Sequence, residues 1–144
     1  MKTISLWQPW ATLIAIEAKH CETRSWGTPY RGMMAIHAAK NVSELPVCNQ
    51  PVFRRVLEKE GYLIWNTLPL GAIVAIGELV DCFQMTPAII AQQSDQERAF
   101  GDWKPGRYGW LFVNVRRVKP FPYRGAQGLF DAELPAVLES EVTS

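Results

Sequence analysis

Residues 5–26 read SLWQPWATLIAIEAKHCETRSW and combine aromatic side chains, a helix start and a charged cluster in one run. Residues 7–10 (WQPW) place two indoles around a proline, which suits the first position of a helix because the N–H it lacks would be unpaired there anyway. Lys19, Glu22 and Arg24 then follow within six residues. Such a density of aromatic and ionisable groups is unusual in a purely structural segment, so we expect this run to organise both the fold and the site.

Hydrophobic spacing predicts how this run folds. A helix is expected over residues 9–18, with three apolar side chains at the i, i+3, i+4 spacing of one helix face: Trp10, Leu13 and Ile14. A strand is expected over residues 21–26, where side chains alternate between two faces. That alternation puts Glu22, Arg24 and Trp26 on one face.

The remaining chain alternates short β-favouring runs with short helical patterns. Further strands are predicted at residues 3–6, 33–37, 71–83 and 111–116, and helices near residues 51–61, 86–91 and 134–138. Another short helix is predicted to begin at Ser94, before a loop that starts at Phe100. Gly77 is expected to mark a bulge in the third of these strands. Strict alternation over residues 110–116 predicts one face carrying Trp110, Phe112, Asn114 and Arg116. Strands mixed with helices, without regular βαβ order, indicate an α+β domain on a small curved sheet or barrel.

Composition is that of one ordinary domain. With 144 residues and 48% hydrophobic side chains the chain can bury a core, so a single domain over residues 1–144 is expected. No apolar run approaches the roughly 20 residues that span a bilayer, and no signal-peptide core follows the N-terminus. Three cysteines without CxxC spacing indicate reduced thiols rather than a disulfide framework or a zinc knuckle. We therefore expect a cytoplasmic protein with no membrane association.

Charge is unevenly distributed, although the formal net charge is only +1. Residues 98–124 hold seven basic side chains and one acidic side chain, whereas the ionisable groups from residue 131 onward are all acidic. This basic stripe has two interpretations that the sequence leaves open: a solvated face, or a surface that contacts nucleic-acid phosphates.

The segment 17–24, EAKHCETR, resembles a motif of the ASCH domain family, whose members are small relatives of the PUA RNA-binding domain. The family pattern GxKxxExR has three of its four fixed residues here, as Lys19, Glu22 and Arg24. Glu17 stands in the glycine position, where a positive φ costs glutamate about 1 kcal/mol more than glycine. The shape of the helix exit is therefore expected to differ locally.

The resemblance continues through residues 5–11, 35–40, 101–110 and 124–130 and so covers most of the chain. It implies an α+β fold built on a PUA-like small β-barrel with short flanking helices. It also implies RNA-related roles, with RNA or a nucleoside as the partner.

The resemblance also implies a chemistry. Some small bacterial members hydrolyse the amide of N4-acetylcytidine with a lysine at the position of Lys19. In that branch a threonine stands where this chain has Glu22, and a further glutamate takes part, a role that Glu97 would fill. The catalytic residues implied are therefore Lys19, Glu22 and Glu97. Each also has a structural interpretation: a solvated lysine after a helix, an ion pair with Arg24 or Lys19, and a capping box with Ser94.

An aromatic and charged cleft is expected between residues 7–26 and residues 97–110. The residues expected to contact substrate are Trp7, Gln8, Trp10, Arg24, Trp26, His37, Arg107 and Trp110. Gln8 could read a base edge or cap the helix start, and His37 could instead be a hydrogen-bonded residue at the end of a strand. Because the chain has only two histidines and no clustered cysteines, no metal and no cofactor are expected.

Three functions follow from these features. The first is a cleft for a pyrimidine-type base, free or in RNA, in which Lys19 orients or activates water, Glu22 or Glu97 moves the proton and Arg24 or backbone N–H groups stabilise the oxyanion. The second is an RNA-binding module without catalysis, which uses the basic stripe for phosphates. The third is a ribonuclease, which neither a pair of catalytic histidines nor a metal cluster supports.

Overall fold

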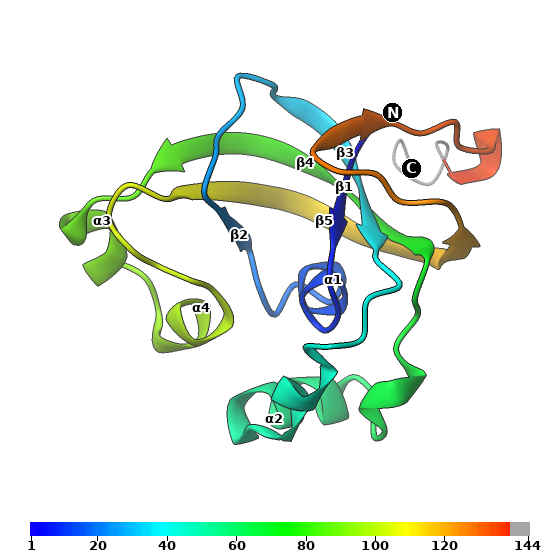
Figure 1. Ribbon diagram of the computed structural model, residues 1–144, viewed down its shortest axis with the longest axis horizontal. Helices are drawn as coiled ribbons and strands as arrows, with labels where there is room; N and C mark the ends of the chain where they lie inside the picture. Colours follow the sequence, from blue (N-terminus) through cyan, green and yellow to red (C-terminus); the bar gives the residue numbers. More distant parts are fainter. Residues whose placement is uncertain (139–144) are drawn as a thin grey trace.

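The computed structural model describes residues 1–138 as a curled six-stranded sheet with short helices packed beside it (Figure 1). The strand order is β2-β5-β4-β3-β1-β6, and β1 runs parallel to β3 whereas the other neighbours are antiparallel. The strands are β1 (Lys2–Leu6), β2 (Cys21–Arg24), β3 (Gly32–Ala38), β4 (Ala72–Gln84), β5 (Tyr108–Pro122) and β6 (Leu129–Asp131). This arrangement confirms the predicted α+β class and the small, barrel-like curved sheet.

Six helical segments lie wholly within residues 1–138. They are α1 (Trp10–Ala15), η1 (Leu45–Asn49), α2 (Pro51–Lys59), η2 (Trp65–Thr67), α3 (Pro87–Ala91) and α4 (Asp95–Phe100), where η marks a 3-10 helix. Over residues 1–138, no helix has the length and apolar character that crossing a bilayer requires. The helix predicted at residues 134–138 is present at residues 136–138, where the described residues end.

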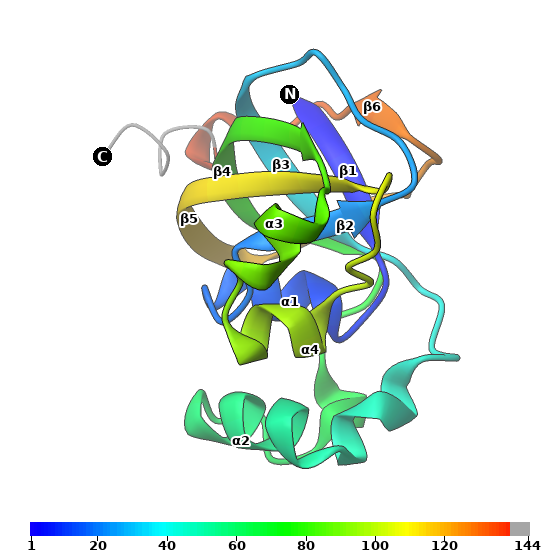
Figure 2. The same cartoon turned by 90° about the vertical axis from the view of Figure 1, so that its left-hand side faces the viewer.

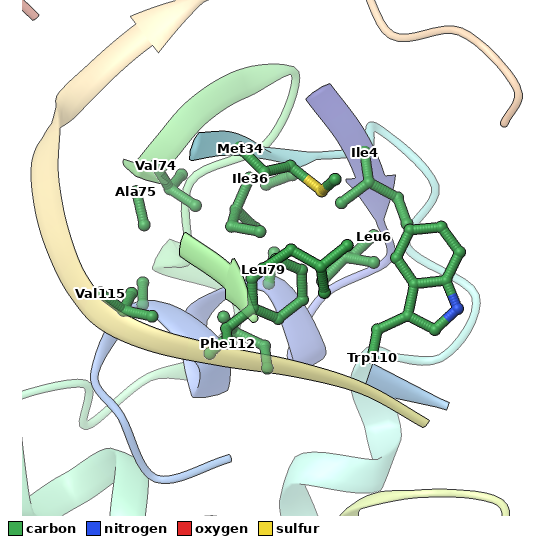
Figure 3. Packing of buried hydrophobic residues seen from close by; sticks show 14 residues of the cluster. Ile4, Leu6, Met34, Ile36, Val74, Ala75, Leu79, Trp110, Phe112 and Val115 are labelled. Carbon is green, nitrogen blue, oxygen red and sulfur yellow. The ribbon is translucent and has the colours of Figure 1, made fainter. Parts of the chain in front are cut away.

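The main core fills the concave side of the curled sheet (Figure 3). Long strands β4 and β5 supply aliphatic side chains, as the β-branched run after residue 71 predicted, and Trp110 and Phe112 are buried among them. Ile4, Leu6, Met34 and Ile36 close the other side of this cluster from β1 and β3. The core therefore requires strands from both halves of the chain.

A β-bulge between the paired strands β4 and β5 interrupts the alternation that the sequence predicted. Asn114 has a φ of 52° and lies opposite Gly77, where the register between β4 and β5 shifts. The extra residue turns Val115 into the same core as Trp110 and Phe112, so the predicted face assignments fail beyond residue 113. The predicted bulge at Gly77 is confirmed by the register shift between Ile76 and Glu78. Glycine suits this position, because a Cβ there would lie 2.9 Å from Cγ2 of Val115.

Helix α1 lies between the sheet and α2 (Figure 2) and contacts strands β1, β3, β4 and β5. Ala11 and Ile14 belong to the main core, whereas Leu13 packs into a second cluster with Phe53 of α2 and Phe100 of α4. Both faces of this short helix are therefore buried. The second cluster therefore joins α1 to α2 and α4.

Glu17, which stands at the glycine position of the GxKxxExR pattern, lies in the turn that follows α1. Glu17 has a φ of 60°, the left-handed conformation that glycine adopts without strain. Its N–H donates to the carbonyl of Ile14 and the N–H of Ala18 donates to that of Leu13, both at 3.0 Å, which is a Schellman ending. The helix therefore ends at Ala15 and not at the predicted residue 18, while the exit keeps the form for which glycine is suited.

Glu17→Gly should raise the free energy of unfolding by about 1 kcal/mol, because glycine relieves the left-handed strain and the Glu17 side chain is exposed. Urea unfolding measures the change. Glu17→Ala is the control, since it removes the charge and keeps the strain. An equal gain with alanine would assign the effect to charge and contradict the backbone explanation.

Candidate functional site

A cavity of about 620 Å³ opens between α1, β2, α4 and the start of α2. One wall is the turn from β1 into α1, the second is β2 with the residues after it, and the third is α4 with its following loop. The fourth wall is η1 with the start of α2; Figure 1 shows where these elements lie. The lining residues are Ser5, Trp7, Trp10, Glu22, Thr23, Arg24, Ser25, Trp26, Val47, Gln50, Phe53, Ala99, Phe100, Gly101, Asp102 and Arg107. The cavity thus lies between the two segments for which a cleft was expected.

Glu22 carries the charge network of this cavity. Its Oε2 atom lies 3.3 Å from Nε of Arg24, its Oε1 atom lies 3.7 Å from Nζ of Lys19, and Oε1 also accepts the N–H of Thr23 at 3.1 Å. Only 11% of the Glu22 side chain is exposed. The carboxylate is therefore fixed between two cations, with one edge facing the cavity.

Arg24 joins β2 to the neighbouring wall. Its Nη2 atom donates to the carbonyl of Ser5 at 2.8 Å, at the end of β1, while Nε faces Glu22. One guanidinium thus holds both the carboxylate and the strand end in place. About a quarter of this side chain, 26%, remains exposed to a ligand.

Lys19 lies behind Glu22 and not on the cavity surface. Its side chain is fully buried, and Nζ donates to the carbonyl of Cys21. Burial raises the pKa of the Cys21 thiol to about 12; the Lys19 ammonium opposes this shift, while Glu97 and Glu22 add to it. The Cys21 thiol is therefore not a nucleophile at neutral pH. Lys19 does not line the cavity itself, but its ammonium contacts Glu22, which does.

Glu97 supports the turn that carries Lys19. Its N–H donates to Oγ of Ser94 at 3.1 Å, which forms half of the predicted capping box. Its side chain turns inward instead of closing the box, and Oε1 accepts the N–H of His20. The other oxygen, Oε2, is buried without a hydrogen-bond partner in the described chain. Glu97 therefore lies next to the cavity wall and outside the cavity lining.

Arg107 fastens the loop after α4 to β2. Its Nε donates to the carbonyl of Asp102 at 2.9 Å and lies 3.5 Å from that residue's Oδ2, while Nη2 donates to the carbonyl of Thr23 at 3.4 Å. The N–H of Asp102 donates in turn to Oγ1 of Thr23 at 3.0 Å. The guanidinium therefore lines the cavity as part of a fixed loop.

Three of the four expected indoles reach the cavity. Trp7 is 45% exposed, and Trp10 and Trp26 are half-buried, so all three present ring surface to the cavity. Trp110 is fully buried: its ring packs edge-on against Trp26 at 4.9 Å between centroids, and its Nε1 donates to the Trp26 carbonyl at 3.1 Å. Trp110 thus supports a cavity residue from within the core.

Gln8 is fully buried at the start of α1. Its Nε2 donates to Oγ1 of Thr12 at 2.7 Å and to the carbonyl of Pro69 at 2.9 Å, and its Oε1 accepts the N–H of Thr12 at 3.0 Å. Of the two roles left open by the sequence, this geometry corresponds to capping the helix start.

His37 lies away from the first cavity, next to β1. Its Nε2 donates to the carbonyl of Tyr123 at 2.7 Å, so Nδ1 accepts the hydroxyl of Ser5 at 2.8 Å. The structure thus corresponds to a hydrogen-bonded residue near the end of its strand. Within residues 1–138, no group of three or more His, Cys, Asp or Glu side chains is placed to hold a metal ion.

The stability of the protein should fall as the pH drops from 7.5 to 5.5, with His37 as a source. Burial lowers the pKa of His37 below its ordinary value of 6.5, so the unfolded chain binds more protons than the folded one as the pH falls through 6.5. The contribution is complete above that pH and is lost below it. Urea unfolding at several pH values measures this slope.

His37→Gln should flatten this pH dependence, whereas Leu63→Ala should leave it unchanged, because it replaces an exposed side chain that does not titrate. Equal slopes in the wild type and His37→Gln would contradict the assignment.

The structure therefore sorts the expected site residues into two groups. Six line the first cavity: Trp7, Trp10, Glu22, Arg24, Trp26 and Arg107. Five lie outside its lining: Gln8, Lys19, His37, Glu97 and Trp110. Sequence reasoning missed the wall from η1 and α2, because the apolar face of α2 indicates packing equally well whether or not a cavity borders it. Phe53 of this helix does both, since it packs on Phe100 at 4.8 Å and lines the cavity.

Comparisons with known proteins agree with this fold and this motif. The family model described as ASCH domain matches residues 4–122. Activating signal cointegrator 1 of Mus musculus is 34% identical over 103 residues, which cover 67% of this chain and 18% of that protein. The Homo sapiens protein of the same name gives the same identity and coverage. The chain therefore spans less than a fifth of the length of these two relatives.

Solved structures give the same fold at low sequence identity. The ASCH protein from Zymomonas mobilis superposes with a TM-score of 0.52 and 15% identity, covering 99% of this chain and 92% of that one. A mutant form of the same Zymomonas mobilis protein gives the same score and identity, with 99% and 95% coverage. At this identity the likeness concerns the fold alone.

Proposed function

Because the chain belongs to the ASCH domain family, we propose that it is an RNA-associated module whose 620 Å³ cavity binds an unpaired or modified pyrimidine base, in RNA or as a nucleoside. One observation carries the proposal: exposed and half-buried indoles surround a buried carboxylate that is held between two cations. We place this role in the cytoplasm, a reducing compartment in keeping with the three free cysteines.

Base recognition needs a flat apolar surface and directed polar groups, and this cavity offers both. The rings of Trp7, Trp10 and Trp26 provide stacking surface, and stacking on an aromatic side chain is worth about 1–3 kcal/mol per base. Glu22 offers acceptor oxygens that suit the amino group of cytosine, while Arg24 beside it donates to ring nitrogen or carbonyl acceptors. Cytosine presents these groups side by side, whereas uracil has a carbonyl where cytosine has its amino group.

Amide hydrolysis of N4-acetylcytidine is the second candidate function. It is favoured by the 3.7 Å separation of Lys19 and Glu22 and by the contact of Glu97 with the same turn. Here Glu22 would contact the attacking water, Lys19 would act through Glu22, and the products would be cytidine and acetate. Because Lys19 is buried and paired, we rank binding without turnover first.

Calorimetry with cytidine, N4-acetylcytidine and uridine tests the binding proposal, and chromatography of an overnight mixture with N4-acetylcytidine tests hydrolysis. We expect saturable binding of the cytidines, weaker binding of uridine, and loss of affinity in Arg24→Gln. Leu63→Ala is the control, because this side chain is 76% exposed and lies outside the cavity. No binding of any nucleoside would contradict the binding proposal, and absence of free cytidine would exclude the hydrolysis.

A further inference from the structure

A second cavity, of about 920 Å³, lies on the far side of the end of β1. Its lining residues are Ser5, His37, Ala39, Lys40, Leu70, Gly71, Pro122, Tyr123, Arg124, Gly125, Ala126 and Gln127. Ser5 also lines the first cavity, so the two cavities meet at one residue. The carbonyl of Ser5 accepts from Arg24, whereas its hydroxyl donates to His37.

The charge of the second cavity has one sign. Lys40 and Arg124 are exposed basic side chains, and no carboxylate side chain is among the lining residues. Neither side chain forms an ion pair within residues 1–138. Within the basic stripe, several side chains other than Arg124 are paired with carboxylates. Arg98 contacts Asp95, Arg107 contacts Asp102 and Arg117 contacts Glu60. Lys40 and Arg124 therefore have their charges available for an anionic ligand.

The backbone segments around this cavity pack closely against their neighbours at two glycines, Gly125 and Gly71. A Cβ on Gly125 would lie 2.8 Å from Cε1 of His37 and 3.3 Å from Oγ of Ser5, so only glycine lets the loop after β5 lie this close to β3. Gly71 lies under the stem of Lys40, where a Cβ would approach Cε at 2.8 Å. Both cations are therefore attached to segments that are packed against the sheet.

We propose that the second cavity is a phosphate-binding subsite, which holds a backbone phosphate of the RNA whose base occupies the first cavity. The inference rests on the proposed base-binding function. His37 donates to Tyr123 and accepts from Ser5, so the groups that hold the phosphate are Lys40, Arg124 and the amide of Gln127. A single strand that passes over Ser5 places a base on one side and a phosphate on the other.

The first test compares cytidine with its 5′- and 3′-monophosphates by calorimetry at low salt. At least one monophosphate should bind the wild type about tenfold more tightly than cytidine, and Lys40→Gln/Arg124→Gln should lose this gain while its affinity for cytidine stays unchanged. The control is Arg55→Gln/Lys59→Gln, which removes the same charge from exposed positions of α2 outside both cavities. Equal behaviour of the two double variants would overturn the proposal.

The second test separates this proposal from the base-binding function. The salt dependence of binding to a short pyrimidine oligoribonucleotide is measured for the same variants, and loss of two phosphate contacts should reduce the slope of log K against log[salt] by about 1.4. A reduced slope in the Lys40/Arg124 variant without any cytidine binding supports the phosphate subsite and contradicts the base site. An unchanged slope together with cytidine binding overturns the subsite and leaves the base site standing.

Discussion

Glu22→Ala should lower the free energy of unfolding by about 3–5 kcal/mol, because it removes the anion that faces the fully buried ammonium of Lys19. Besides Glu22, the partner of that ammonium is the carbonyl of Cys21. The same change removes the carboxylate 3.3 Å from Arg24 in the cavity. Urea unfolding measures the loss, and nucleoside binding should disappear with it.

Lys19→Met should cost less than Glu22→Ala. Glu22 keeps Arg24 and the N–H of Thr23 when Lys19 is removed, whereas Lys19 loses its counter-ion when Glu22 is removed. Adding Lys19→Met to Glu22→Ala should therefore recover part of the lost stability, since no unpaired buried charge remains. A double variant less stable than Glu22→Ala alone would contradict this explanation and indicate that Lys19 is held mainly by its packing and by Cys21.

Sequence patterns predicted those parts of the fold that depend on neighbouring residues. The β-branched run after residue 71 predicted β4, and Thr86-Pro87 predicted the start of α3, where Oγ1 of Thr86 accepts the N–H of Ile89. The parallel pairing of β1 with β3 and the edge position of β2 are contacts between distant segments, so local spacing did not determine them. Asn114 shows the same limit, because its left-handed conformation is imposed by the partner strand at Gly77.

In the candidate site, too, the sequence predicted what depends on neighbouring residues and not what depends on contacts between distant segments. Alternation placed Glu22, Arg24 and Trp26 on one face of a strand over residues 21–26. All three line the cavity, but so do Thr23 and Ser25 from the predicted opposite face, and the strand ends at Arg24. Burial of Lys19 was not predicted, because a lysine after a helix ordinarily faces water. It is buried here because α4, distant in the sequence but adjacent in space, holds the turn before β2: Gln96 donates to the carbonyl of Ala18 at 2.8 Å, and Glu97 accepts from His20.

A formal net charge of only +1 is compatible with the proposed binding of RNA at the two cavities. Four side chains of the basic stripe are paired with carboxylates within residues 1–138: Arg98, Lys104, Arg107 and Arg117. Lys40 and Arg124, which form no ion pair within residues 1–138, both lie at the second cavity, next to a cavity with aromatic walls. Such an arrangement favours a few defined contacts with one or two nucleotides over coating of a long strand.

Trp7→Ala should weaken binding of cytidine by about 1–3 kcal/mol while leaving the free energy of unfolding nearly unchanged. Trp7 is 45% exposed and lines the cavity, so its ring is available to a base and contributes less to the core than the other cavity indoles. Trp26 is unsuitable for this test, because its ring packs on Trp110 and its loss would disturb the fold. Calorimetry with cytidine, together with urea unfolding of the same sample, measures both quantities.

Trp7→Phe is the matched variant, because a smaller aromatic ring retains part of the stacking surface and should recover part of the affinity. Leu63→Ala removes a large exposed apolar side chain outside the cavity and should change neither quantity. Wild-type affinity in Trp7→Ala would show that the exposed indole is not a stacking surface, and the base would then have to lie deeper, against Trp10 and Trp26. A smaller loss of affinity in Trp7→Phe than in Trp7→Ala would place the base directly on this ring.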